Sequence, residues 1–519
     1  MAKKPSADLF HLIKSLSRNE KGYFKKYVSR HTLKGENNYV RLFDAIDRQK
    51  TYDEDKLLRK ESYIRQLPLL KNYLYQMILE SLENFYSKSR INIRLYNMIT
   101  RIQILYNKGL YDQCHKMARQ IKKMAYRFDE FSVLLETLKW EKVLLGYELT
   151  FRKLEDVIRE ENEVRAFQQQ VNDLQNLSLR FLALHKQHGT INEGEPARSK
   201  LKTLIGELPE EKKLHSFTAW LHYLRIQGYY YYMLGDWESC FNYREKLVSH
   251  CEENSGYIRE EPAEYISAIH QVLNACSPLN NKDAFFGYLQ KLKSITEVIP
   301  DTDTRVNKGR IFAESHNLEL RWYIMRGEFE KGLKTVEEVE KGLGEYDNDE
   351  VNQTLVQENI FNIAFICFGA GQYEQALKWI TKALDEMDQE HGLSGMLDFR
   401  CRLLKLMVLH EKGDFDVLES EVKHAFRFAY TKQRTYKMEL FLLDFFRKLA
   451  KTGSDKSKTQ QICREFIDEM PELKEDTYEK SLFDGFDFLA WVRSRMEGIS
   501  YIQAIKEKAV LADKGNVSG

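Results

Sequence analysis

Five Gly-x-aromatic triplets recur along the chain, each between two apolar stretches with helical periodicity. The last three of their glycines stand 44 and 42 residues apart. A repeat of this length is typical of α-solenoids, in which each unit is a helical hairpin that packs on the next. By first and third residue, the triplets are Gly109/Tyr111, Gly235/Trp237, Gly327/Phe329, Gly371/Tyr373 and Gly413/Phe415. We interpret them as the elbows of helical hairpins.

Composition also indicates an all-α protein. The 519 residues include 8 prolines and 26 glycines, against roughly 5% and 7% in average proteins. Charged residues make up 30% of the chain, as expected for solvated helix faces, and strict apolar alternation is rare. A solenoid grows by adding units, so the length does not require several separate cores.

The elbows carry further regular features. A glycine tolerates the backbone of the turn, and the aromatic residue two positions later covers the joint between the two helices. Five positions after the glycine stands a small residue, which lets the helices approach closely; Leu418 is the exception. The small residues are Cys114, Cys240, Gly332 and Ala376.

This pattern resembles the tetratricopeptide repeat, and Gly228 and Tyr231 match that family's first-helix glycine and aromatic. The spacing exceeds the family's 34 residues and the closing proline is missing, which longer helices would explain. HEAT-like repeats have a suitable period but lack this elbow. The resemblance implies a right-handed α-solenoid of about ten hairpins over residues 91–513, with an extended concave face.

Degenerate elbows complete the expected set of hairpins. They are predicted near Thr150-Phe151, within 191–196, within 277–280, within 451–454 and within 498–500. Residues 514–519 are expected to form a disordered tail.

Residues 1–90 lack the repeat and are predicted to form an N-terminal helical cap. Ser17 and Glu20 have capping-box spacing before a basic amphipathic helix that extends through Arg30. Pro68 suits the first turn of a second helix, over residues 69–86. This segment resembles the leaders of uncharacterised bacterial repeat proteins, a likeness that implies no activity.

The family resemblance also implies positions for a ligand groove. Tetratricopeptide repeats contact ligands thirteen, ten, six and three residues before the turn glycine. In this sequence the corresponding residues are His222, Arg225, Tyr229, Tyr232, Glu314, Asn317, Arg321, Arg400 and His410. Such side chains suit an extended peptide, through charge-assisted hydrogen bonds and rigid aromatic contacts. Polar surface and contacts between repeats are the alternative reading.

Local motifs for catalysis, phosphate binding or zinc binding are absent from the sequence. His185 and His188 share a helix face without further ligands nearby, so we expect a surface pair. The seven scattered cysteines are expected to be small core residues in a reducing compartment. We therefore predict neither metal nor cofactor, no catalytic residues, and a cytoplasmic protein without a signal peptide or membrane span.

Charge is unevenly distributed along the chain. Residues 1–130 contain 27 lysines and arginines against 14 acidic residues, and such asymmetry can indicate an anionic partner. In the first basic helix, Tyr23, Phe24 and Tyr27 lie between Lys21, Lys25, Lys26 and Arg30. This interleaving suits nucleic acid or a helix that packs its aromatic residues inward, and we favour packing.

The sequence therefore predicts a non-enzymatic scaffold that binds a protein or peptide on a concave repeat face. The alternative is a nucleic-acid-associated regulator with a basic N-terminal segment and a ligand-sensing repeat domain. Salt dependence of binding separates the two, because neutralising phosphates releases counterions.

Overall fold

The computed structural model is all-α over the residues it describes. The described residues form helices that are joined by turns and short loops, and they include no strand. The described residues are 6–29, 38–60, 63–64, 66–87, 90–148, 151–191, 196–298, 308–343, 353–389, 395–431, 437–470 and 487–516. The predicted fold class, an all-α protein of helices that pack in sequence-adjacent pairs, is confirmed.

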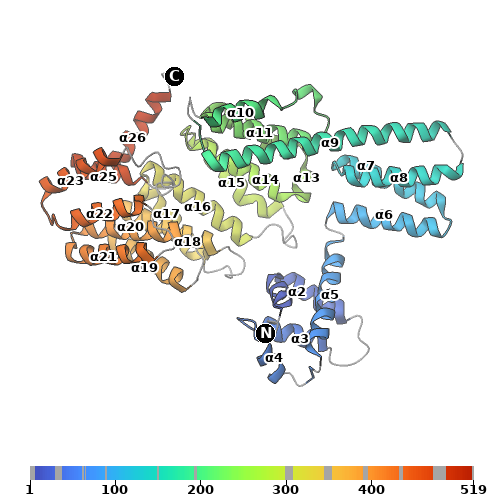
Figure 1. The fold of residues 1–519 in the computed structure, drawn as a ribbon, viewed down its shortest axis with the longest axis horizontal. Coiled ribbons are helices and arrows are strands. Elements are labelled where there is room, and N and C mark those ends of the chain that lie inside the picture. Colours follow the sequence, from blue (N-terminus) through green and yellow to red (C-terminus); the bar gives the residue numbers. More distant parts are fainter. Residues whose placement is uncertain are drawn as a thin grey trace. The chain divides into compact units, whose positions relative to one another are not determined.

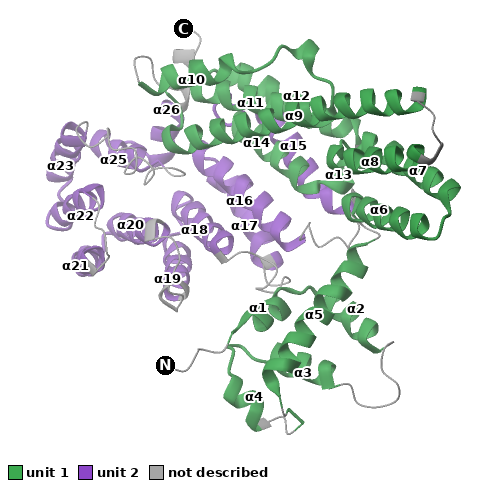
Figure 2. Ribbon diagram, turned by 45° about the vertical axis from the view of Figure 1, so that its right-hand side comes forward, with its two compact units in different colours: residues 1–275, 299–305 green, residues 276–298, 306–519 purple. Residues whose placement is uncertain are grey.

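The chain divides into two compact units (Figure 2). Unit 1 comprises residues 1–275 and 299–305, and unit 2 comprises residues 276–298 and 306–519. The sequence predicted one uninterrupted solenoid over residues 91–513, and this division was not foreseen. The predicted right-handed superhelix is a property of the whole chain and stays a prediction.

Unit 1 begins with a helical cap and continues with paired helices (Figure 1). In chain order its helices are α1 (Asp8–Ser15), α2 (Arg18–Ser29), α3 (Asn38–Asp47), α4 (Glu54–Lys60), α5 (Leu67–Tyr86), α6 (Ile91–Asn107), α7 (Tyr111–Arg127), α8 (Phe131–Glu148), α9 (Phe151–His188), α10 (Pro196–Gly206), the 3-10 turn η1 (Glu211–Lys213), α11 (Phe217–Leu234), α12 (Trp237–Glu253), α13 (Ser255–Glu260) and α14 (Pro262–Cys276).

The cap has its own hydrophobic core. Its buried residues come from α1 to α5, and Phe24 of α2 stacks on Phe43 of α3 with ring centroids 4.8 Å apart. The predicted capping box is present: Glu20 accepts a hydrogen bond from the Ser17 amide at 2.7 Å, and the Ser17 hydroxyl accepts one from the Glu20 amide at 3.3 Å. Glu20 also accepts from the hydroxyl of Tyr86, which ties α2 to the end of α5.

A second hydrophobic core of unit 1 starts with α6, and the boundary predicted near residue 90 stays a prediction. This core gathers buried residues from α6 to α9, including Leu95, Ile121 and Leu138. Lys122 on α7 bonds Glu141 of α8 at 2.9 Å and Glu160 of α9 at 2.7 Å, which connects the three helices. The hairpins predicted around residues 150 and 192 share the 38-residue helix α9, because no glycine or proline interrupts Phe151–His188.

Unit 2 repeats the paired arrangement. Its helices are α15 (Lys282–Val298), α16 (Lys308–Arg326), α17 (Phe329–Leu343), α18 (Gln353–Gly369), α19 (Tyr373–Gln389), α20 (Gly395–Lys412), α21 (Phe415–Thr431), α22 (Lys437–Ala450), α23 (Lys456–Glu469), α25 (Phe488–Glu497) and α26 (Tyr501–Asn516). Each helix from α15 to α23 packs on the next, and α26 also contacts α16. The predicted tail begins inside α26, which ends at Asn516; residues 517–519 lie outside the described residues.

All five predicted elbow glycines have a left-handed backbone. Their φ angles lie between +62° and +76°, a region that side chains other than glycine occupy at a cost. Gly189, Asn280, Gly453 and Gly498 share this conformation and lie at or beside the predicted degenerate elbows. From residue 189 onward these residues follow one another at 189, 235, 280, 327, 371, 413, 453 and 498, so the period is regular across both units.

Small residues permit the predicted close approach within the hairpins. Cys114, Cys240 and Ala376 are fully buried. A Cβ atom at Gly332 would lie 2.4 Å from Cδ1 of Ile366, so α17 and α18 meet at this glycine. All seven cysteines are buried and none is in a disulfide. Among the described residues, every helix is too short or too polar to cross a lipid bilayer.

Candidate binding face on α11

Four of the predicted groove residues lie on one face of α11, because their spacings of three and four residues match the helical period. Ser216 caps the helix by accepting a hydrogen bond from the Ala219 amide, and Gly235 ends it. The four residues are His222, Arg225, Tyr229 and Tyr232. His222 is buried and the other three are half-buried, so their contacts with neighbouring helices decide what they can bind.

Arg225 and His222 face α14. The Arg225 guanidinium pairs with Glu264, and only 13% of the arginine side chain is exposed. Burial and the charge of Arg225 lower the pKa of His222 to about 4, so this imidazole is neutral at physiological pH. Its Nδ1 atom is buried and has no hydrogen-bond partner among the described residues.

His185 of α9 joins the same face, which the sequence did not predict. Its ring lies 5.6 Å from the ring of Tyr229 and 4.6 Å from that of Tyr232. Burial, followed by the charge of Arg244, lowers its pKa. The surface position expected for His185 is therefore wrong, because its ring packs on two tyrosines and its Nδ1 atom is buried.

Arg244 of α12 is the second residue that sequence reasoning missed. It is 3% exposed and lies in the apolar stripe with Cys240, Leu247 and Cys251. Its Nη1 donates to the Gln271 carbonyl at 2.8 Å, and its guanidinium lies 5.0 Å from the centroid of the Tyr232 ring. No described carboxylate lies within ion-pair distance of it. The sequence did contain a signal for this residue: Arg244 stands at helical spacing from Cys240, Leu247 and Cys251, among residues that are otherwise apolar.

Gly228 makes room for Arg244. A Cβ atom at this position would lie 3.1 Å from Cγ of Arg244, so the arginine stem lies directly against the α11 backbone. The absence of a side chain at Gly228, the glycine that matched the repeat signature, therefore leaves the space that the buried Arg244 occupies in this hairpin.

Residues three positions before an elbow glycine pack on the elbow aromatic. Tyr232 contacts Trp237 with ring centroids 5.0 Å apart, and His410 contacts Phe415 at 5.9 Å. Tyr106 and Tyr111 make the same contact at 5.6 Å, at an elbow where no ligand residue was predicted. Tyr232 and His410 therefore hold their hairpins together, whatever else they contact.

In unit 2, α16 carries three predicted residues with different surroundings. Glu314 accepts a hydrogen bond from Arg310 at 2.7 Å, and Asn317 donates to Glu358 of α18 at 3.5 Å. Arg321 is exposed. Asn317 is 5% exposed, so it contributes to the packing of α16 on α18 rather than to an open surface.

The two predicted residues of α20 are separated along the helix. Arg400 is half-buried near its start. His410, near its end, packs against Trp491 of α25 with ring centroids 5.5 Å apart, and both of its ring nitrogens are buried without a described partner. Burial and the charge of Arg495 lower the pKa of His410 to about 4.

This depressed pKa predicts acid sensitivity of unit 2. The ordinary histidine pKa is about 6.5, so the unfolded state takes up a proton on His410 at higher pH than the folded state. The contribution of His410 to the free energy of unfolding is therefore fully present above about pH 6.5 and is lost as the pH falls toward 4. We expect His410 to account for a loss of about 2 kcal/mol between pH 7.5 and pH 5.

Urea unfolding of the full-length protein at these two pH values measures the effect. His410→Leu should reduce the loss of stability on acidification. His424→Leu, which replaces an exposed histidine of the same unit, should leave the loss unchanged. Equal pH dependence in the wild type and His410→Leu would contradict the prediction.

The cap places part of its basic helix in intramolecular ion pairs. Lys21 bonds Asp47 at 2.8 Å and Lys25 bonds Asp44 at 2.7 Å, both on α3. Phe24 is buried, in agreement with the packing interpretation. Arg30 lies outside the described residues.

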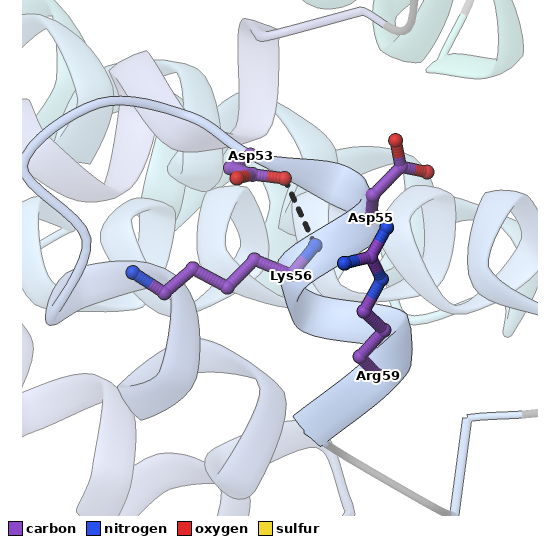
Figure 3. A pocket seen from close by; sticks show the side chains of 4 residues that line it. All are labelled: Asp53, Asp55, Lys56 and Arg59. Atoms are coloured by element: carbon purple, nitrogen blue, oxygen red, sulfur yellow. Dashed lines mark hydrogen bonds between the residues drawn. The ribbon is translucent and has the colours of Figure 1, made fainter.

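The structure also contains a shallow hollow on α4 (Figure 3). Asp53, Asp55, Lys56 and Arg59 line a volume of about 550 Å³, and all four residues are exposed. Oδ1 of Asp53 accepts a hydrogen bond from the Lys56 amide at 2.9 Å, which is a helix cap. In the part of the chain that the structure describes, no group of three or more histidine, cysteine or acidic residues is arranged to hold a metal ion.

Comparison of the sequence with models of protein families gives no match, and comparison with curated proteins gives none either. The candidate face on α11 therefore has to be interpreted from its own geometry.

Proposed function

We propose that the chain is a non-enzymatic scaffold, built from tetratricopeptide-like hairpins, that binds a protein or an extended peptide on the α11 face. We define the α11 face as His185, His222, Arg225, Tyr229, Tyr232, Arg244 and Gln271. One observation carries the proposal. Four buried polar atoms of this face, each on a different helix, have no described hydrogen-bond partner: His185 Nδ1, His222 Nδ1, Arg244 Nε and Gln271 Oε1.

Such atoms require an explanation, because nearly all buried polar groups in native proteins are hydrogen-bonded. Three of the four residues are connected, because the Tyr232 ring contacts both His185 and Arg244, and Arg244 bonds the Gln271 carbonyl. His222 lies two turns before Tyr229 on α11. The four atoms are enclosed in this structure, whereas Arg225, Tyr229 and Tyr232 are half-buried and border them. A peptide backbone offers both donors and acceptors, and it reaches the enclosed atoms when these half-buried side chains move aside.

Stacked hairpins favour this use of the face. Helices fixed by their neighbours hold the side chains in place before the ligand arrives, which lowers the entropy lost on binding. The proposal assigns no chemical step to these residues. Seven buried cysteines, none of them in a disulfide, are in keeping with a reducing compartment, and we place the protein in the cytoplasm.

Affinity capture from a nuclease-treated native lysate tests the proposal with full-length protein as bait. We expect a stoichiometric protein partner, and we expect Arg225→Gln combined with Tyr229→Phe to reduce its recovery at least ten-fold. The matched control, Arg159→Gln combined with Tyr430→Phe, makes the same chemical changes at exposed positions. It should retain the partner.

Hydrogen exchange of the recovered complex locates the contact. Slower exchange of α9, α11 and α14 amides is expected when the partner is bound. Loss of the partner from the control variant as well, or protection confined to other helices, would rule out the α11 face as the binding site.

A further inference from the structure

The positive charge of the N-terminal region is concentrated on its first hairpin. Residues 87–127 contain ten lysines and arginines and a single acidic residue, Asp112. This segment holds nine of the thirteen excess positive charges of residues 1–130. The described part of the segment consists mainly of α6 and α7, so the charge lies on one folded element.

On α6, the basic residues lie opposite the core. Ile91, Leu95, Met98 and Ile102 are buried toward α7 and α8. Arg94 and Arg101 of α6 and Lys108, which caps its C-terminal end, are exposed and stand seven residues apart, which is two helical turns or about 10 Å. The three cations therefore follow one line along the helix.

The exposed polar surface of α6 has no carboxylate. It also includes Tyr96, whose side chain is 53% exposed. The remaining exposed polar residues are Asn92, Asn97, Thr100, Gln103 and Asn107.

On α7, a similar line of cations covers the exposed face. Cys114, Ala118, Ile121 and Ala125 are buried, whereas Lys116, Arg119 and Lys123 are exposed at spacings of three and four residues. Lys122 differs, because it is held between Glu141 and Glu160. The exposed cations of α7 are therefore separate from the ion pairs that stabilise the fold.

We define the basic hairpin face as Arg94, Arg101, Lys108, Lys116, Arg119 and Lys123. None of these six residues forms an ion pair with a carboxylate in the described parts of the chain. By contrast, the cap pairs Lys21 and Lys25 internally. Six uncompensated cations on one hairpin keep their full capacity for an external polyanion.

We propose that the basic hairpin face binds nucleic acid through its sugar-phosphate backbone. Arginine and lysine neutralise phosphates, and asparagine, glutamine, threonine and tyrosine donate further hydrogen bonds to phosphates and sugars. An exposed tyrosine between arginines also suits base stacking. An acidic protein fits less well, because lysine is depleted from the cores of protein–protein interfaces. The inference concerns a different surface from the α11 face and does not depend on it.

Fluorescence anisotropy tests the inference with full-length protein and short labelled oligonucleotides, single-stranded and duplex, DNA and RNA. We expect binding at ~0.05 M salt that weakens steeply as salt is added. The test variant combines Arg94→Gln, Arg101→Gln, Lys116→Gln and Lys123→Gln. It should bind at least ten-fold more weakly. Its slope of log affinity against log salt should be smaller by up to about 3 on single strands and up to about 4 on duplex DNA.

The control variant removes two arginines and two lysines elsewhere on unit 1: Arg152→Gln, Arg159→Gln, Lys200→Gln and Lys202→Gln. All four positions are exposed, so both variants change net charge equally. The control should keep most of the affinity. Absence of binding by the wild type, or equal loss in both variants, would overturn the proposal. So would tighter binding of poly-glutamate with the same dependence on the six cations, which would indicate an acidic protein.

Discussion

Replacement of Trp491 by alanine is expected to lower the free energy of unfolding of unit 2 by about 3–5 kcal/mol. Trp491 is fully buried on α25 and stacks on Phe446 of α22, with ring centroids 5.6 Å apart. Its Nε1 donates to Glu411 of α20 at 2.7 Å. One side chain therefore connects three helices, and its removal leaves both a cavity and a carboxylate without one of its donors.

Denaturant unfolding of the full-length protein measures this loss, and hydrogen exchange of α22 and α25 assigns it to unit 2. Trp491→Phe keeps most of the packing and removes only the indole donor. Because Arg495 still bonds Glu411 at 2.9 Å, we expect this variant to lose about 1–2 kcal/mol. Tyr430→Ala, at a residue 67% exposed in the same unit, should change little. Comparable losses for Trp491→Ala and Tyr430→Ala would show that Trp491 does not hold these helices together.

Gly369→Ala is the second large change, and we expect it to destabilise unit 2 by about 2–3 kcal/mol. A Cβ atom at Gly369, the last residue of α18, would lie 2.3 Å from the ring of Phe329. Phe329 is an elbow aromatic, 1% exposed, and also packs against Phe365 and Tyr501. Its ring is held on several sides, so the added methyl group requires α17 and α18 to separate.

Gly287→Ala is the matched control. Gly287 lies in α15 of the same unit, and no atom outside its immediate backbone neighbourhood lies within 4 Å of the Cβ position. Alanine is the better helix former, so this variant should gain up to about 1 kcal/mol. The two substitutions are chemically identical and should have opposite signs in thermal or denaturant unfolding. A neutral Gly369→Ala would mean that Phe329 moves aside freely.

The local features of the fold were predictable because short-range physics sets them. A left-handed turn selects glycine, so all five elbows could be located from Gly-x-aromatic spacing. The capping box at Ser17 and Glu20 is likewise a property of four successive residues. The helix predicted over residues 69–86 from Pro68 is present as α5, which begins two residues earlier, at Leu67. In each case a few neighbouring residues fix the backbone.

The burial of the predicted groove residues could not be predicted from the sequence. The position of a residue along a helix determines which face it shares, but it does not determine how deeply its side chain is buried. His222, Arg225, Tyr229 and Tyr232 share a face of α11 as expected, yet His222 is buried and Tyr232 packs on Trp237. Asn317 is buried against α18 although it resembles a surface polar residue. The burial of these side chains depends on contacts with neighbouring elements, which the position of a residue within its own helix does not reveal.

The sequence by itself determined that the chain is helical, where its hairpins turn and where its positive charge lies, since each depends on residue type and short-range spacing. Only the tertiary structure decided which polar groups are buried together. His185 and Arg244 are 59 residues apart in sequence, and both contact the Tyr232 ring because α9 and α12 both pack on α11. Burial and electrostatic coupling depend on distances in space, and those distances exist only after the helices have packed.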